Sequence, residues 1–292
     1  MKILILGGNG MIGHKMYQVL SKYYSDTYVS IRSYDTKYDH LFNRDKVIIL
    51  NDASDFNNLN KLLNNLKPDV IINSIGITIR RGVNYNVSKT IAINSLLPHT
   101  LSNWCESNNK KLIHFSTDCV FNGTKQSYNQ NDKPDAIDLY GKTKSLGELN
   151  NKHSLTLRGS MIGRELENKT ELLEWFLNQK NESINGFDKV YYSGITTVRM
   201  ANYILKILKT NMEMSGIYNV SSKPISKYEL LKLFAIYFNI NTQINIESNK
   251  QSSKVLESDL FFGTIKECQP DWNELIVELK NDCINNTELY EI

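Results

Sequence analysis

Short apolar runs alternate with amphipathic stretches through the first half of the chain. Each run is continuous, and glycine or polar turn residues follow it. Continuous runs of this kind are typical of strands that are buried on both faces, as in a parallel sheet. The pattern predicts strands at 2–6, 28–31, 47–50, 69–73 and 111–116, with helices that begin near residue 11 and cover 56–66 and about 87–107.

Strands that alternate with helices imply right-handed crossovers and a Rossmann-type, doubly wound parallel α/β sheet. After about residue 153 the alternation loosens, with a strand at 154–157, helices at 172–177 and 198–208, a strand at 216–220 and a helix from 226. This pattern indicates a smaller C-terminal substrate-binding lobe over the carboxyl ends of the strands. We assign 1–155 and about 190–212 to the larger domain, and 156–189 and 213–292 to the lobe.

Composition narrows the class of protein. The chain has 292 residues, of which 41% are hydrophobic, and a net charge of +3 with both signs interspersed. The length and the hydrophobic content fit a single large core. The interspersed charges argue against a nucleic-acid partner, so small polar substrates are expected. The four cysteines form no C-x-x-C pair, which argues against a metal site and for a reducing, cytoplasmic setting. No apolar run approaches the roughly 18 residues of a membrane span.

A glycine-rich turn joins the first predicted strand to the first helix. Gly7, Gly10 and Gly13 have the spacing that permits a tight turn, close approach of a pyrophosphate and close helix packing, with Met11 and Ile12 at the helix start. A purely structural glycine turn is the alternative. The context of strand, loop and helix favours a dinucleotide site.

The ends of the next strands indicate which dinucleotide binds. Arg32, followed by Ser33, offers a guanidinium to a 2′-phosphate, which favours NADP(H); a solvated surface arginine is the alternative. Asp52 is placed to accept from the adenine amino group, unless it caps the following helix. Ser74 and Gly76 follow the fourth strand and are expected beside the cofactor.

Candidate reactive groups follow the fifth strand. Tyr140 and Lys144 stand at i and i+4, so on a helix they share one face, and the ammonium is expected to lower the pKa of the phenol. A solvated helix pair is the alternative. Thr117 and Cys119 fall on one side of the chain if strand alternation persists, which would let Thr117 hydrogen-bond a carbonyl that is being reduced.

These motifs together resemble the extended short-chain dehydrogenase/reductases. The glycine loop, Asn94 with Pro98, the phrase STDCVFNG at 116–123 and YGKTK at 140–144 are similar to the dTDP-4-dehydrorhamnose reductase group. The resemblance implies NADPH-dependent reduction of the C4 ketone of a UDP- or dTDP-linked 4-keto-6-deoxyhexose, in deoxysugar synthesis for surface glycans. The triad that it implies is Thr117, Tyr140 and Lys144; Tyr140 and Lys144 would also bind the cofactor, Lys144 at the nicotinamide ribose. The implied substrate contacts are Asp118, Asn94 and Arg164. A homodimer through helices that flank the sheet is common in the family.

Cys119 departs from that pattern, because the group usually has an aromatic residue after the aspartate. The segment resembles the S-S-C-I-Y phrase of GDP-fucose synthases, which are 3,5-epimerase-reductases and use the cysteine to epimerise. By this resemblance Cys119 would invert C3 before reduction. Fucose synthases use a histidine of the second lobe as the acid on the opposite sugar face, but His153 is the last histidine of this chain, so Lys169 or Lys180 would have to serve unless both are solvated surface charges. A small buried hydrophobe is the alternative.

Two other functions stay open. The regulatory subunit of methionine adenosyltransferase resembles the same branch, so a non-catalytic subunit is an alternative. A 4,6-dehydratase fits less well, because Asp118-Cys119 follows Thr117 where such enzymes have an Asp-Glu pair. Arg80 and Arg81 are further candidates for a nucleotide pyrophosphate contact.

Overall fold

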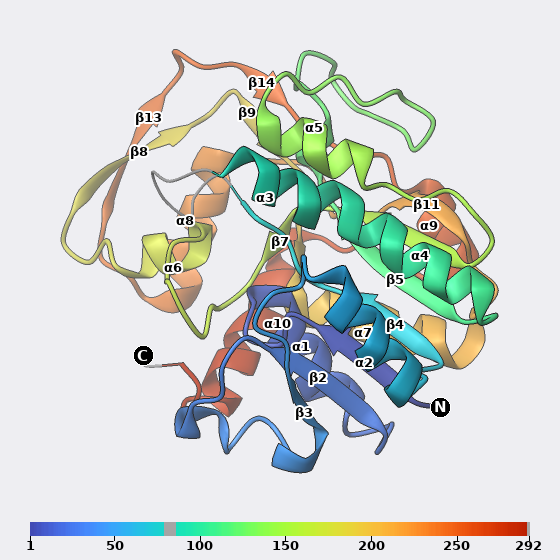
Figure 1. The fold of residues 1–292 in the computed structure, drawn as a ribbon. Helices are drawn as coiled ribbons and strands as arrows, with labels where there is room; N and C mark the ends of the chain where they lie inside the picture. Colours follow the sequence, from blue (N-terminus) through green and yellow to red (C-terminus); the bar gives the residue numbers. More distant parts are fainter. Residues whose placement is uncertain (79–85, 291–292) are drawn as a thin grey trace.

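The computed structural model describes residues 1–78 and 86–290, which form a three-layer α/β arrangement (Figure 1). Arg80 and Arg81 lie outside the described residues. Seven strands form one parallel sheet in the order β11-β6-β5-β4-β1-β2-β3. Their bounds are β1 Ile3–Leu6, β2 Thr27–Ile31, β3 Val47–Ile49, β4 Val70–Asn73, β5 Lys111–Ser116, β6 Ser154–Arg158 and β11 Gly216–Asn219. The predicted doubly wound sheet is confirmed.

Helices cover both faces of the sheet, which explains why its central strands β1, β4 and β5 are buried along their whole length. On one face, strand side chains pack with α1 (Met11–Leu20), α7 (Thr197–Thr210) and α10 (Trp272–Asn285). On the other they pack with α2 (Phe56–Leu66) and α4 (Leu97–Ser107). All four residues of β1 are fully buried as a result.

The predicted helix over 87–107 contains a wider turn. It comprises α3 (Val87–Ile91), a π-helical turn η4 (Ala92–Leu96) and α4, with Pro98 in the first turn of α4. Proline has no N–H, so it cannot donate to the carbonyl of Asn94 four residues earlier. Gly147 packs against that carbonyl: a Cβ at Gly147 would lie 2.0 Å from the oxygen.

The smaller lobe is built from short elements above the carboxyl ends of the strands (Figure 1). Its sheets pair β10 with β7, β9 with β12 and β14, and β8 with β13. The bounds are β7 Met161–Ile162, α6 Leu172–Leu177, β8 Ser183–Phe187, β9 Val190–Tyr192, β10 Ile195–Thr196, β12 Ile225–Ser226, α8 Lys227–Phe238, β13 Gln243–Glu247, β14 Ser252–Ser253 and α9 Asp259–Ile265.

The predicted division into two domains stays a proposal, and several elements of the range 213–292, predicted for the lobe, pack on the central sheet. α10 covers one face of the sheet, and α9 packs against β11. β11 lies within 213–292, the range predicted for the lobe, but it pairs with β6 at the edge of the central sheet. The sequence predicted this strand at 216–220 but not the sheet to which it belongs, because a single edge strand has no neighbouring crossover pattern in the sequence. In the part of the chain that the structure describes, no helix is both long and apolar enough to cross a membrane.

Candidate active site and dinucleotide pocket

The glycine loop is a tight turn against β2. Gly7 has φ of +85°, a conformation that side chains with a Cβ rarely adopt, and the N–H of Gly10 donates to its carbonyl at 3.0 Å. A Cβ at Gly13 would lie 2.1 Å from the same carbonyl oxygen. No side chain caps α1, so the N–H groups of its first turn are available to an anion.

A cavity opens above this loop at the carboxyl ends of β1, β2, β3 and β4. Of the predicted cofactor residues, six line it: Gly7, Gly10, Arg32, Asp52, Ser74 and Gly76. Six others do not: Met11, Ile12, Gly13, Ser33, Tyr140 and Lys144. The hydroxyl of Ser74 is buried and has no partner among the described residues. A cavity with a glycine loop, an exposed arginine and an orphaned hydroxyl fits a phosphorylated dinucleotide.

Asp52 lies on the adenine side of the predicted site and pairs with Lys89, a cavity-lining residue that the sequence analysis missed. Bonds from Lys89 and from Ser54 lower the pKa of Asp52 to about 2, so it is an acceptor only. The alternative as a helix cap is wrong, because Asp55 caps α2 through the N–H of Asn58.

Thr117 ends β5 and begins a 3₁₀ turn, η5 (Asp118–Val120). Its hydroxyl accepts from the N–H of Cys119 and donates to Asp118, both at 3.1 Å. Strand extension does not persist past Thr117, because the cap bends the chain there, yet the Thr117 side chain still lies beside Cys119 and hydrogen-bonds it. The turn is also why Asp118 is buried beside Thr117.

Tyr140 and Lys144 lie on α5 (Leu139–Leu146), which begins at the cap Asp138. A hydrogen bond links the Tyr140 phenol to Thr117, yet burial first, and then the nearby Cys119, raise the pKa of Tyr140. Lys144 is buried, donates to the carbonyl of Phe115 at 2.6 Å, and has a pKa lowered to about 8 by burial. The expectation that Lys144 lowers the tyrosine pKa is wrong here, since desolvation dominates.

Cys119 lies beside this pair. Its carbonyl is so near α5 that a Cβ at Gly141 would lie 2.3 Å from it, and Gly141 is a site residue that the sequence analysis missed. Burial and the neighbouring Asp118 raise the pKa of the Cys119 thiol to about 12, while Lys254 acts in the opposite direction. Cys119 is therefore a thiol at neutral pH. Lys169 and Lys180 are both exposed.

Asn94 does not lie where a substrate contact was predicted. Its side chain is buried, accepts from the N–H of Ile77, and donates to the carbonyl of Ile77 and to Thr143. These bonds occupy the donors and acceptor of the amide. Asn94 therefore links the loop after β4 to α5, the helix that carries Tyr140 and Lys144.

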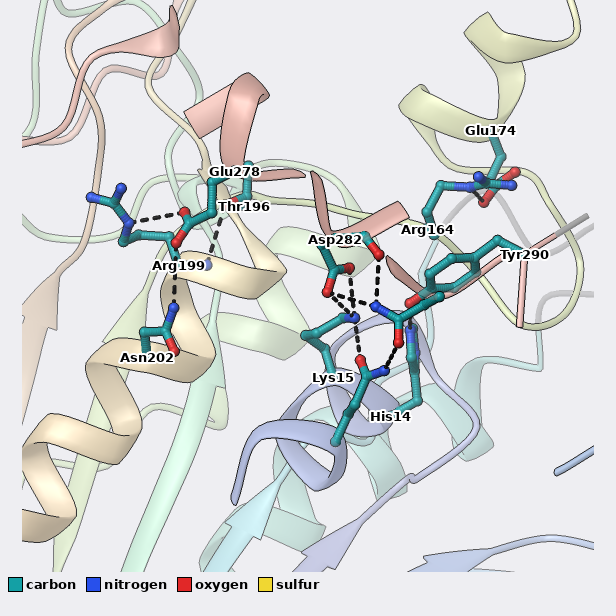
Figure 2. Close-up of polar contacts among 12 residues, drawn as sticks. His14, Lys15, Arg164, Glu174, Thr196, Arg199, Asn202, Glu278, Asp282 and Tyr290 are labelled. Carbon is teal, nitrogen blue, oxygen red and sulfur yellow. Dashed lines mark hydrogen bonds and ion pairs between the residues drawn. The ribbon is translucent and has the colours of Figure 1, made fainter. Parts of the chain in front are cut away.

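Arg164 is also engaged elsewhere. Its guanidinium is buried, donates to Glu174 at 2.7 Å, and lies 5.0 Å from the ring centre of Tyr290 (Figure 2). This geometry does not support a direct contact with a sugar nucleotide. The adjoining segment does reach the cofactor cavity, because Glu167 and Asn168 line it, and Glu167 accepts from Tyr38. No local pattern in the sequence identifies these residues.

The fold and site define a class: an α/β protein with a dinucleotide pocket at the carboxyl ends of its strands and a Thr-Tyr-Lys group at the end of β5, as in the extended short-chain dehydrogenase/reductases. A model of the family described as the RmlD substrate binding domain matches residues 1–255. The chain belongs to this family.

Curated relatives have several activities. The chain is 28% identical over 149 residues to the "Probable low-salt glycan biosynthesis reductase Agl14" of Haloferax volcanii, covering 51% of this chain and 48% of that protein. The match thus spans about half of that relative. This chain is also 25% identical to the dTDP-4-dehydrorhamnose reductase of Aggregatibacter actinomycetemcomitans, over 99% of this chain and 92% of that protein. It is 24% identical to methionine adenosyltransferase 2 subunit beta of Xenopus tropicalis, covering 82% and 72%.

A solved structure shares the fold. The dTDP-4-dehydrorhamnose reductase of Bacillus anthracis, in complex with NADP, superposes with a TM-score of 0.79 at 21% identity, covering 96% of this chain and 99% of that one.

Proposed function

We propose that this protein reduces the C4 ketone of a nucleotide-linked 4-keto-6-deoxyhexose with NADPH, in the synthesis of a deoxysugar. The observation that supports this most is the convergence of Thr117 and Tyr140 at the end of β5, with Lys144 on the same helix as Tyr140. β5 is the neighbour of β4, and the residues after β4 line the cavity. Relatives named as dTDP-4-dehydrorhamnose reductases support the same class of reaction.

In this proposal NADPH, when bound, supplies a hydride to C4. Thr117 and Tyr140 hydrogen-bond the ketone oxygen, and Tyr140 gives it the phenolic proton. The high pKa of Tyr140 keeps that proton in place until the oxygen gains negative charge. Asp118, an acceptor at the end of β5, would hold a sugar hydroxyl, and the lysine would support the phenolate that forms. Arg32 would bind the 2′-phosphate, Ser74 would lie beside the cofactor, and Lys144 would hold the nicotinamide ribose.

The test is turnover with a panel of substrates. Purified protein is incubated with NADPH and with UDP- and dTDP-linked 4-keto-6-deoxyhexoses, while NADPH absorbance and the NMR spectrum of the sugar are followed. We expect one sugar to consume NADPH in a 1:1 ratio and to yield a C4 alcohol. If no sugar oxidises NADPH although NADPH binds, the reductase proposal fails.

A non-catalytic subunit is a second candidate, supported by the similarity to methionine adenosyltransferase 2 subunit beta. The two candidates differ in a measurable way. A subunit would bind the dinucleotide, show no turnover with any keto sugar, and co-purify with a larger enzyme.

C3 epimerisation by Cys119 is a separate proposal. Its support is the position of Cys119 next to Tyr140, and the raised thiol pKa argues against a free thiolate. In deuterated water an epimerising enzyme would place deuterium at C3, and Cys119→Ser would abolish the label. A product without deuterium at C3 from the unaltered protein retires this proposal.

A further inference from the structure

The turn after α10 is locked onto the helix that starts at the glycine loop. Tyr290 in this turn is 1% exposed, and its hydroxyl lies 2.8 Å from Nε2 of His14 on α1 (Figure 2). Nδ1 of His14 lies 2.8 Å from the carbonyl oxygen of Gly10, which lines the cofactor cavity. Three groups from opposite ends of the described chain thus form one line of hydrogen bonds that ends at the loop.

The direction of these hydrogen bonds follows from chemistry. Burial and the neighbouring Lys15 lower the pKa of His14 to about 3, so the ring is neutral and carries one N–H. A carbonyl oxygen can only accept, so the hydrogen is on Nδ1 and Nε2 is the acceptor. The Tyr290 hydroxyl therefore donates to Nε2, and Nδ1–H donates to Gly10.

Fixing the Gly10 carbonyl orients the peptide that follows it. In a trans peptide the C=O and N–H bonds point in opposite directions, so the Met11 N–H is held facing away from His14. That N–H belongs to the uncapped first turn of α1, whose amides are available to a phosphate. On its other side the loop is held by the bond from Gly10 N–H to Gly7.

Tyr290 also contacts a support of a second part of the cavity lining, which lies next to the glycine loop, because Glu167 accepts from Asn9 of that loop at 3.5 Å. Its ring stacks with the guanidinium of Arg164, at 5.0 Å from the ring centre. Arg164 begins the segment that carries Glu167 and Asn168 into the cavity. One side chain therefore contacts supports of two neighbouring parts of the cavity lining, the glycine loop and the segment with Glu167 and Asn168.

We propose that Tyr290 and His14 are positioning residues, which orient the glycine loop for the pyrophosphate of the cofactor without touching it. This inference rests on the proposed function, since it takes a dinucleotide as the ligand of the cavity.

The first test compares two ligands in Tyr290→Phe, which removes the hydroxyl and keeps the ring. We expect the Kd of NADPH, measured by calorimetry, to rise about fivefold, the range of one lost hydrogen bond. The Kd of adenosine 2′-monophosphate, which has no pyrophosphate, should stay within twofold. A merely structural role would weaken both ligands alike, and that result, or an unchanged Kd of NADPH, overturns the proposal.

A matched control is available where α1 meets the turn after α10. Gln18 on α1 donates to Asn286, one turn before Tyr290, and does not touch the loop. Gln18→Met should leave the ratio of the two dissociation constants unchanged. In a cycle with His14→Leu, adding Tyr290→Phe should weaken NADPH binding no further; additive losses would show that Tyr290 does not act through His14.

Hydrogen exchange of the protein without ligand tests the positioning role of Tyr290 independently of the proposed reductase function. The amides of Gly10 and His14 are bonded within the loop and first turn, so they should exchange several-fold faster in Tyr290→Phe than in Gln18→Met. Equal exchange in the two variants contradicts the positioning role. If the unaltered protein fails to bind NADPH, the proposed function fails, while the exchange rates still decide whether Tyr290 orders the loop.

Discussion

At the scale of single residues, the three proposed catalytic side chains have different surroundings, and these decide their protonation. Tyr140 keeps its proton because burial and nearby acidic groups disfavour the phenolate. Lys144 is buried enough for its pKa to fall to about 8. Thr117 is fixed by the backbone of the turn that it caps. A proton donor, a titratable amine and an oriented hydroxyl suit the reduction of a ketone.

Replacing Tyr140 by phenylalanine should lower kcat for the ketone at least 100-fold, because a positioned general acid contributes that much or more. Binding of NADPH, measured by fluorescence titration, should change less than threefold. Tyr23→Phe, at an exposed tyrosine on the surface, is the control and should keep full activity. Residual turnover above a tenth of the original rate would contradict the role of the phenol.

The pKa of Lys144 predicts the pH above which reduction of the ketone slows. Its ammonium keeps the proton below about pH 8 and loses it above, so the positive charge that supports the forming phenolate disappears as pH rises. The kcat/KM for reduction should therefore be level below pH 8 and fall above it. In Lys144→Arg, which stays charged, the activity is lower but the fall near pH 8 should vanish. A fall at the same pH in both proteins would assign it to another group.

At the scale of elements, the site depends on how closely α5 approaches its neighbours. Gly141 allows α5 to pack against the turn at Cys119, and Gly147 allows it to pack against the Asn94 carbonyl that Pro98 leaves free. Asn94 adds side-chain bonds to α5 and to the loop after β4. These contacts set the distance between Tyr140 and Thr117.

Gly141→Ala should separate α5 from the Cys119 turn, because its Cβ would lie 2.3 Å from a carbonyl oxygen. We expect a loss of about 1–3 kcal/mol in unfolding free energy, as for an overpacked core, together with a drop of tenfold or more in kcat. The measurements are urea unfolding and steady-state kinetics.

Gly263→Ala is the matched control for this substitution. It lies within α9, and a Cβ there meets nothing within 4 Å. It should stabilise the protein by about 0.4–1 kcal/mol with no effect on kcat. Equal effects of the two substitutions would contradict the packing argument.

At the scale of the whole molecule, the cofactor cavity joins parts that are distant in the sequence. Strand ends of the central sheet form its floor, and the segment with Glu167 and Asn168 forms part of its wall. Tyr290, in the turn after α10, contacts His14 of α1, which follows the glycine loop, and Arg164, which precedes that segment. A ligand bound in this cavity should therefore stabilise the fold as a unit.

NADPH at 100 times its Kd should stabilise the protein by about 2.7 kcal/mol, seen as a rise in the thermal midpoint. NADH at the same concentration should raise the midpoint less, because only NADPH offers a 2′-phosphate to Arg32. Arg32→Ala should remove this difference, while Arg44→Ala, at an exposed arginine paired with Asp39 outside the cavity, should preserve it. Equal shifts with both cofactors in the unaltered protein would contradict the preference for NADP(H).

Local patterns determined much of this protein by themselves. The continuous apolar runs predicted the strands, because helices on both faces leave no polar side for them. The glycine spacing predicted the tight turn at Gly7, and the position of Arg32 after β2 predicted its place at the cavity. Each of these properties depends on neighbours a few residues away, so the sequence alone contains it.

Tertiary structure decided the protonation and the contacts of the site residues. The pKa values of Tyr140 and Cys119 depend on burial, which no spacing reveals. Asn94 and Arg164 bind neighbours rather than a ligand, because their partners come from other elements. The bond from Tyr290 to His14 joins residues 276 positions apart. Such contacts exist only once the chain has folded, since burial and long-range pairing are properties of the packed molecule and not of any short segment.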